Sequence, residues 1–595
     1  MDDSTNNTFF AAAMHHFTAV RPFIPMYLHL LFSALAPIYT GAHASLSRPS
    51  SAAKPVKVTK DATDDDDEDE DEDEDKVQKM EGLSPSDAIV FPITAGCVLA
   101  GLYFLIQRYG ADLINMVMSF YFAAVGIYSV ATLWKDGNDI VNSFVFPTWF
   151  AQGKTLYKVD GAARKAIAQD TTSEPVQSRD SPIPYIPAFT KSFYDSMWAL
   201  RAAIKRRYTT SLHIPSVITY KGNLALNNLI SVFVGLGTIF YANVISTSKP
   251  WYLTNLQGFA VCYQALQFMS PTTFFTGTLI LTGLFFYDIW AVFFTPLMVT
   301  VAKNLDQPIK MVFPRPDDPG ATMGSDGKMP PRSYSMLGLG DIVLPGLMIG
   351  LALRFDLYMF YLKKQKKVAN AQNVTPDVEN SSSKDDDSTI EKAPYVAPTG
   401  YLGDRFWTAL LPTSARPARL NTSFPKPYFY ASVVGYIVGM IATLAVMSIW
   451  NHAQPALLYL VPGVLISLWS TALVRGEISE MWNFSEGVSG DQVEGEEGKE
   501  KMEDMVEEVK GLWEWIRGAI LGSSSKPEAK KEDKTAAEDK KKNEGSTSTD
   551  SGKKDEKDDV VISFSIVRYD PKQSKSETAA QPSKAKGSFE VRDLD

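Results

Sequence analysis

Two aspartates are the residues of this chain best placed to do chemistry. Asp288 lies in the apolar segment Phe274–Lys303, and Asp341 lies in the next one, Ser335–Asp356. Each segment is as long as the roughly 20 residues that cross a bilayer as a helix. An ionisable side chain at that depth costs about 3 kcal/mol or more, so it usually marks a functional site. Two such aspartates in neighbouring spans predict that their carboxyl groups act as a pair.

A pair of facing carboxyl groups can hydrolyse a peptide bond. The two groups cannot both ionise cheaply, so they share one proton. The ionised carboxylate then takes a proton from an attacking water, while the protonated carboxyl polarises the carbonyl oxygen. Paired buried carboxylates also relay protons in transporters. A transporter more often shows internal repeats and broken helices in both halves, and neither is evident in this sequence.

Short motifs accompany both aspartates. Tyr287 directly precedes the first, and Gly338, Leu339 and Gly340 directly precede the second, Asp341. Glycine lets another backbone approach closely and permits unusual backbone angles, so a second chain could pass near this aspartate. Taken alone, such glycines are also common as small-residue contacts between membrane helices.

A third motif, Gln454-Pro455-Ala456-Leu457, opens the last apolar segment. Proline is common in the first turn of a helix, where its missing N–H costs nothing. That is the simplest interpretation of this motif on its own. The motif becomes informative in combination with the two aspartates.

Long apolar blocks between charged loops predict an all-α polytopic membrane protein with nine transmembrane helices. The expected spans are Met26–Ser45, Ala88–Gln107, Asp112–Trp134, Leu224–Ile245, Trp251–Ser270, Phe274–Lys303, Ser335–Asp356, Pro427–Ile449 and Gln454–Val474. The first span ends in Ala42-His43-Ala44, which is similar to a signal-peptidase site, but its length favours a retained helix. The two cysteines, Cys97 and Cys262, lie in apolar segments, which excludes a disulfide framework.

Basic residues set the expected orientation, because cytosolic loops are enriched in Lys and Arg. Insertion 135–223 and loop 358–426 carry such residues. We therefore expect a lumenal N-terminus, with Asn6 as a glycosylation candidate, and a cytosolic C-terminus. The run Asp64–Asp75 is entirely acidic and predicts a solvated spacer. The expected regions are a lumenal segment 1–25, a membrane part 26–134 with a disordered acidic linker 46–86, a cytosolic insertion 135–223, a catalytic core 224–357, a cytosolic loop 358–426, two final spans in 427–480 and a disordered cytosolic tail 481–595.

Together, the three motifs resemble the signature of the GxGD intramembrane aspartyl proteases, which have the presenilin-type fold. Within that group the chain is most similar to the signal peptide peptidase family, through the stretches FFYDIWAVF, MLGLGDIVLPG and HAQPALLYLVP. The resemblance covers roughly Met26–Glu480 and implies nine transmembrane helices with a lumenal N-terminus. It also implies that Asp288 and Asp341 are the catalytic pair and that Tyr287 flanks the first. The remaining motif residues would shape or line the site: Gly338, Leu339, Gly340, Gln454, Pro455, Ala456 and Leu457.

The resemblance further implies an endopeptidase of the endoplasmic reticulum membrane that cleaves signal peptides and type II transmembrane segments. It implies neither a metal nor an organic cofactor. Expected partners are these substrates, membrane lipid, quality-control proteins of the endoplasmic reticulum and a second copy of the chain, but no nucleic acid. The alternatives are a non-proteolytic scaffold and a proton-coupled transporter. Zinc and serine proteases are disfavoured, since the chain has no HExxH and no GxSxG motif.

A substrate helix must unwind before attack, because its amides are hidden in its own hydrogen bonds. An unwound segment can satisfy its freed N–H and C=O groups by pairing as a strand with exposed backbone. The glycines before Asp341 and the segment at Pro455 are the expected places for such pairing.

Overall fold

The computed structural model describes residues 21–54, 80–169, 178–184, 190–214, 218–245, 250–305, 307, 309–316, 334–372, 392–450, 454–486 and 563–568. Asn6, the acidic run Asp64–Asp75 and most of the expected tail lie outside these residues. The chain divides into two compact units, one of residues 1–206 with 225–495 and the other of residues 207–224 with 496–595.

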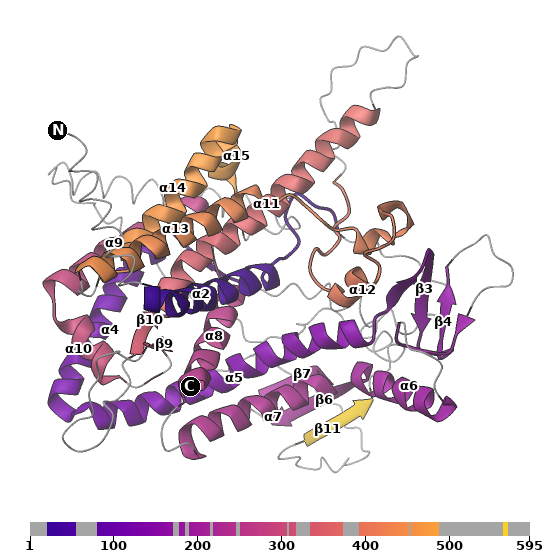
Figure 1. The fold of residues 1–595 in the computed structure, drawn as a ribbon, viewed down its shortest axis with the longest axis horizontal. Helices are drawn as coiled ribbons and strands as arrows, with labels where there is room; N and C mark the ends of the chain where they lie inside the picture. Colours follow the sequence, from indigo (N-terminus) through magenta and orange to yellow (C-terminus); the bar gives the residue numbers. More distant parts are fainter. Residues whose placement is uncertain are drawn as a thin grey trace, which may run out of the picture. The chain divides into compact units, whose positions relative to one another are not determined.

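The first unit is a bundle of long helices (Figure 1). Eight helices among the described residues are long and apolar enough to cross a membrane, which confirms the expected class, a polytopic helical membrane protein. They are η1 with α2 (Arg21–Phe23 and Ile24–Ala44), α4 (Asp87–Tyr109), α5 (Ala111–Val145), α7 (Leu226–Phe240) with the start of η2 (Tyr241–Ile245), α9 (Phe274–Ile289) with the π-helical turn η3 (Trp290–Phe294), α11 (Gly340–Gln372), α13 (Pro427–Trp450) and α14 (Leu457–Arg475). Helix α7 continues into a π-helical turn, η2 (Tyr241–Ile245).

The ninth expected span, Trp251–Ser270, forms helix α8 (Trp251–Phe268), which is not among those eight. Helix α8 packs against α2, α5 and α11. Its Tyr263 hydroxyl and Gln267 amide donate to Asp136 of α5, at 2.8 and 3.3 Å. These polar side chains contact protein rather than lipid, so α8 can be less apolar than a helix that faces lipid. The count of nine stays a prediction.

Helix α11 is the axis of the first unit. It contacts α2, α8, α9, α13 and α14, and 83% of its most apolar stretch is buried. Asp356 in this helix is 3% exposed. Its carboxyl accepts the backbone N–H groups of Tyr428 and Phe429, at 3.3 and 2.9 Å, in the first turn of α13. Because the first N–H groups of a helix have no intrahelical partner, this buried carboxyl fixes the start of α13 on α11.

A second buried charge of α11, Arg354, joins three other segments. Its Nη1 donates to Ser45 Oγ and its Nη2 to Ser270 Oγ, both at 2.6 Å. Arg354 also forms an ion pair with Glu486, which follows the short helix α15 (Ile478–Asn483). A guanidinium inside a membrane bundle must be paired in this way.

The single helix expected over Phe274–Lys303 is interrupted, which corrects that prediction. Helix α9 ends at Ile289, a π-helical turn η3 (Trp290–Phe294) follows, and α10 (Leu297–Asn304) begins after Pro296. Proline lacks the N–H that continues a helix and disfavours a helical conformation in the preceding residue. Thr295 is accordingly extended, with φ −135° and ψ 146°.

The helix expected over Ser335–Asp356 is also corrected at both ends. Strand β10 (Tyr334–Gly338) occupies its start, and α11 then runs from Gly340 to Gln372. Strand β10 pairs antiparallel with β9 (Lys310–Pro314), so the loop between the two aspartate-bearing segments contains a hairpin. Alternating burial on β9 allows Met311 and Phe313 to face the core.

The expected all-α fold is supplemented by small sheets in the polar regions. Insertion 135–223 contains the antiparallel sheet β2 (Trp149–Gln152), β3 (Thr155–Asp160), β4 (Lys165–Ala168) and β5 (Ser178–Arg179), followed by helix α6 (Lys191–Lys205). Buried Phe150 and Tyr157 pack with Trp198 of α6 in a core of their own. Strand β1 (Glu81–Leu83) pairs in parallel with β8 (Met269–Pro271). The loop before α13 forms α12 (Leu402–Trp407), η4 (Thr413–Ala415) and η5 (Ala418–Leu420).

In the second unit, the described residues form one antiparallel sheet. Its strand order is β11 (Ser563–Arg568), β6 (Arg207–Ile214) and β7 (Ile218–Ala225). Strand β11 lies in the tail 481–595, and the expected disorder of that tail stays a prediction.

Glu477, just after α14, makes stability sensitive to acid. Burial alone would raise the pKa of Glu477, but hydrogen bonds from Arg475, Lys363 and Tyr428 outweigh burial and lower it to about 2. A carboxyl whose folded pKa lies below its ordinary 4.5 contributes stability above that pH and loses it as the pH falls towards 2. Glu477→Gln should therefore lower the free energy of unfolding near neutral pH. Chemical unfolding in detergent should show this deficit shrinking between about pH 4.5 and pH 2; a deficit of constant size would contradict the assignment.

Candidate active site

Asp288 lies near the end of α9 and is 6% exposed. The next residue ends that helix, and the π-helical turn η3 follows at once. Single π turns inside helices occur frequently at functional sites. The Asp288 Oδ2 accepts the backbone N–H of Leu457 at 3.1 Å.

The motif Gln454–Leu457 explains why that N–H is available. Helix α14 begins at Leu457, so Pro455 and Ala456 form the turn just before the helix rather than its first turn. The first N–H groups of a helix have no intrahelical partner, and this end carries a partial positive charge. The motif thereby presents a backbone donor at the positive end of α14 to the Asp288 carboxyl.

Asp341 lies in the first turn of α11 and is partly exposed. Its carboxyl accepts a backbone hydrogen bond from Gly338, and it lies close enough to Asp288 for the two charges to interact. Helices α9 and α11 pack against each other. The structure therefore brings the two sequence-predicted aspartates together, each holding one backbone N–H.

The glycines before Asp341 differ in what they do. A Cβ on Gly338 would lie 3.3 Å from Asp341 Oδ2, so a side chain there would crowd the carboxyl. A Cβ on Gly340 would meet its nearest atom, in Leu344, only at 4.0 Å. Neither glycine has a positive φ. The reason for a glycine at position 338 is therefore the closeness of the Asp341 carboxyl and not an unusual backbone conformation. Leu339 packs toward Gly258 of α8.

Tyr287 faces a neighbouring helix. Its Cε2 lies 3.6 Å from the position of a Cβ on Gly96 of α4, and its ring is tilted against Trp290 at 6.4 Å. Its hydroxyl still interacts electrostatically with Asp288. Tyr287 thus flanks the first aspartate, between α9 and α4.

Helices α13 and α14, orange in Figure 1, lie side by side and hold the motif at Leu457 in place. Glycines make this contact possible: a Cβ on Gly439 would lie 2.7 Å from the carbonyl oxygen of Tyr459, and a Cβ on Gly463 2.5 Å from that of Gly435. Small residues that let helix backbones touch are typical of membrane interfaces.

Gly435→Ala should separate these two helices, because the new Cβ would collide with the Gly463 backbone and the Ser467 hydroxyl. Overpacking of this kind costs about 1–3 kcal/mol, so we expect a lower midpoint of thermal unfolding. Gly101→Ala on α4 is the matched control, since nothing lies within 4 Å of its Cβ. Equal thermal shifts for the two variants would contradict this account of the α13–α14 contact.

Two residues that bond the backbone of the aspartate-bearing helix α11 and of the adjoining hairpin were missed by the sequence analysis. Tyr436 of α13 donates its hydroxyl to the Asp341 backbone carbonyl at 3.4 Å. Asn255 of α8 bonds both main-chain groups of Val312 in β9, at 2.7 and 2.9 Å. Both act on backbone groups of distant segments, so no local motif marks them. The only advance signal was a polar side chain within an apolar segment.

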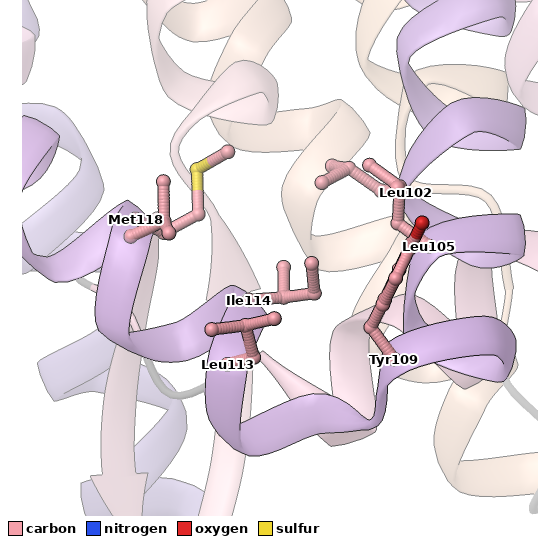
Figure 2. A pocket seen from close by; sticks show the side chains of 7 residues that line it. Leu102, Leu105, Tyr109, Leu113, Ile114 and Met118 are labelled. Atoms are coloured by element: carbon pink, nitrogen blue, oxygen red, sulfur yellow. The ribbon is translucent and has the colours of Figure 1, made fainter.

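An open apolar cavity of about 280 Å³ lies elsewhere, between α4 and α5 (Figure 2). It is lined by Leu102, Leu105, Tyr109, Leu113, Ile114, Val117 and Met118. None of the sequence-predicted site residues lines it. Its lining offers only one polar group, the Tyr109 hydroxyl, so this cavity is not the candidate active site.

The fold and site define a polytopic helical membrane protein with two aspartates brought together inside the bundle. The chain belongs to the signal peptide peptidase family, because the model of that family, described as "Signal peptide peptidase", matches residues 73–487. The matched region includes both aspartates and the motif at Leu457. It begins after α2, whereas the sequence motifs suggested a resemblance from Met26 onward.

Individual relatives agree with this assignment. The chain is 27% identical to the human signal peptide peptidase over 423 residues, which cover 71% of this chain and 79% of that protein. It is 33% identical to intramembrane protease 2 of Caenorhabditis elegans over 255 residues, or 43% and 42% of the two chains. The family is thus one of intramembrane proteases.

Proposed function

We propose that this protein is an aspartyl endopeptidase that hydrolyses peptide bonds within the membrane, with Asp288 and Asp341 as its catalytic pair. The observation that carries the proposal is the packing of α9 against α11, which places the two carboxyl groups close enough for their charges to interact. Each also holds one backbone N–H, from Leu457 and from Gly338. Two carboxyl groups whose charges repel in this way favour a state in which the pair holds one proton, which is the state that acid–base hydrolysis requires.

The proposed reaction uses water as the nucleophile. The ionised carboxylate takes a proton from water while the water oxygen forms a bond to the carbonyl carbon of the substrate. At the same time, the protonated carboxyl gives its proton to the carbonyl oxygen. The resulting gem-diol then breaks its C–N bond: one hydroxyl returns its proton to a carboxylate, and the amine nitrogen takes a proton from the other carboxyl. The products are a carboxylic acid and an amine, and the pair again holds one proton. Either aspartate can be the ionised base, with the other as the protonated acid.

Strand β10 supplies a place for the unwound substrate. Val312 of β9 directs its N–H and C=O away from β10, to the Asn255 side chain. Its partner in the register is Met336, so the main-chain groups of Met336 also point away from the pair. Two residues on, the Gly338 N–H reaches the Asp341 carboxyl. The free edge of β10 therefore leads to the second aspartate.

This edge is open within the described part of the chain, where β10 pairs with β9 alone. Tyr334 and Met336 are 40% and 53% exposed. Exposed strand edges bind extended peptides through main-chain hydrogen bonds. We infer that an unwound substrate segment adds to β10 as a third strand, which would lay its backbone beside Asp341.

The family supports a proposal for the substrates and the location. We propose that the substrates are signal peptides and type II transmembrane segments, and that the protein acts in the endoplasmic reticulum membrane with a lumenal N-terminus and a cytosolic C-terminus. Insertion 135–223, loop 358–426 and tail 481–595 would then be cytosolic. The names of the relatives, signal peptide peptidase and intramembrane protease, support this substrate class.

A binding and turnover experiment tests the proposed function. Wild-type protein purified in detergent is incubated with a fluorescent signal peptide, with and without a hydroxyethylene peptide, which mimics the gem-diol of an aspartyl protease. We expect cleavage of the signal peptide and its competitive loss with the mimic. Tight binding of the signal peptide without any cleavage would instead support a non-proteolytic scaffold.

A further inference from the structure

The backbone carbonyl of Asp341 lacks its usual partner in the helix. In an α-helix, this carbonyl would accept the N–H of the residue four positions on. That residue is Pro345, inside α11, and proline has no N–H. The proline ring also crowds the carbonyl four residues before it. The Asp341 carbonyl therefore cannot form the regular hydrogen bond of an α-helix with residue 345.

Tyr436 of α13 supplies a donor to this carbonyl. Its hydroxyl lies 3.4 Å from the Asp341 carbonyl oxygen, longer than the usual distance of about 2.8 Å. Bonds at catalytic sites are often long without substrate and tighten in the bound complex. The same hydroxyl interacts electrostatically with the Asp341 carboxyl.

The Tyr436 ring is held rigidly. Tyr436 is 0% exposed, and Gly435 and Gly439 of the same helix lie against the α14 backbone. The first turn of the same helix is fixed on α11 by Asp356. Helix α13 is thus anchored to the helix that carries Asp341, with its tyrosine hydroxyl at the carbonyl that Pro345 leaves without a helical donor.

We propose that Tyr436 is a positioning residue for Asp341: its hydroxyl replaces the helical donor that Pro345 removes and so fixes the peptide from which the carboxyl projects. This inference rests on the proposed function, because it assigns the residue a role in that reaction. The hydroxyl acts through the backbone of Asp341 and does not itself exchange a proton with substrate.

A cycle of variants tests the proposal in purified full-length protein. Tyr436→Phe removes only the hydroxyl, and Pro345→Ala restores a helical N–H opposite the Asp341 carbonyl. In the wild-type background, we expect Tyr436→Phe to lower kcat by roughly 5- to 30-fold, with KM changed less than about twofold. In the Pro345→Ala background, the same change should alter kcat by less than about twofold, because the helix now supplies the donor.

Tyr428→Phe is the matched control. Tyr428 is a buried tyrosine on the same helix, but its hydroxyl bonds Glu477. It should lower the midpoint of thermal unfolding while leaving kcat similar in both backgrounds.

The outcomes separate the two proposals. Wild-type protein that cleaves nothing refutes the proposed function and this role with it. Active wild-type protein with an unchanged kcat in Tyr436→Phe, or an equal loss in both backgrounds, overturns the positioning role alone. If Tyr436→Phe does not fold, the double variant should fold because its helix donor is restored, and a double variant that also fails to fold would count against the proposal.

Discussion

Asp288→Asn and Asp341→Asn are each expected to lower kcat/KM for a signal peptide by at least about 10,000-fold, as when other catalytic groups that act as a unit are removed. Asparagine is nearly isosteric with aspartate but neither accepts a proton from water nor donates one as an acid. A single substitution therefore removes the shared proton of the pair. The double variant should be no slower than either single variant, because the two groups act together.

Asp356→Asn is the control for this prediction. It changes a buried carboxyl on the same helix as Asp341, and the role of this carboxyl is to hold the start of α13. It should lower the midpoint of thermal unfolding, yet its kcat per folded molecule should stay within a few-fold of wild type. A loss as large as that of the two other variants would mean that burial of charge, and not the pair, supports activity.

Met336→Pro is expected to lower kcat/KM by roughly 10- to 100-fold, the cost of leaving a substrate carbonyl without its hydrogen bond. Met336 directs its N–H to the free edge of β10, so proline removes this donor without breaking a bond to β9. The effect should be large for an apolar helical substrate and appear in both kcat and KM, because strand addition both binds and unwinds the substrate.

Met336→Ala keeps the N–H and is the matched control. It should retain most of the wild-type kcat/KM, since only an exposed side chain is lost. Equal losses in Met336→Pro and Met336→Ala would contradict strand addition at β10 and would point to contacts of the side chain instead.

The parts of the candidate site that could be predicted from the sequence are the side chains that are costly to place inside a membrane. A carboxyl inside an apolar segment is expensive wherever it lies, so Asp288 and Asp341 stand out in the sequence. Arg354 and Asp356 obey the same rule, but their partners are on other segments, and the structure assigns them to holding the bundle. The sequence cannot separate these two uses, because both depend on what the charge meets.

Hydropathy predicts the membrane helices well where they face lipid and less well where they face protein. Helix α8 buries Tyr263 and Gln267 against Asp136, so its hydropathy understates its place in the bundle. The break at Pro296 and the missing helical donor at Pro345 were visible in the sequence as prolines inside apolar runs. Their consequences were not, because they depend on which segment lies across from each proline.

Backbone contacts account for most of what the sequence did not reveal. The N–H of Leu457 on Asp288, the Tyr436 hydroxyl on the Asp341 carbonyl and the open edge of β10 all involve main-chain groups. Nearly every residue has such groups, so the residue types in the sequence do not indicate which main-chain groups form these contacts. They arise only when distant segments pack together.

The most direct test of the central claim is to map the bond that the protein cuts. Wild-type protein and the Asp288→Asn and Asp341→Asn variants are placed in bilayers with a signal peptide, and the products are identified by mass spectrometry. A membrane-embedded aspartate pair predicts new termini inside the apolar segment of the peptide with wild-type protein and no products with either variant. Cleavage only outside that segment, or products that persist in either variant, would contradict intramembrane hydrolysis by this pair.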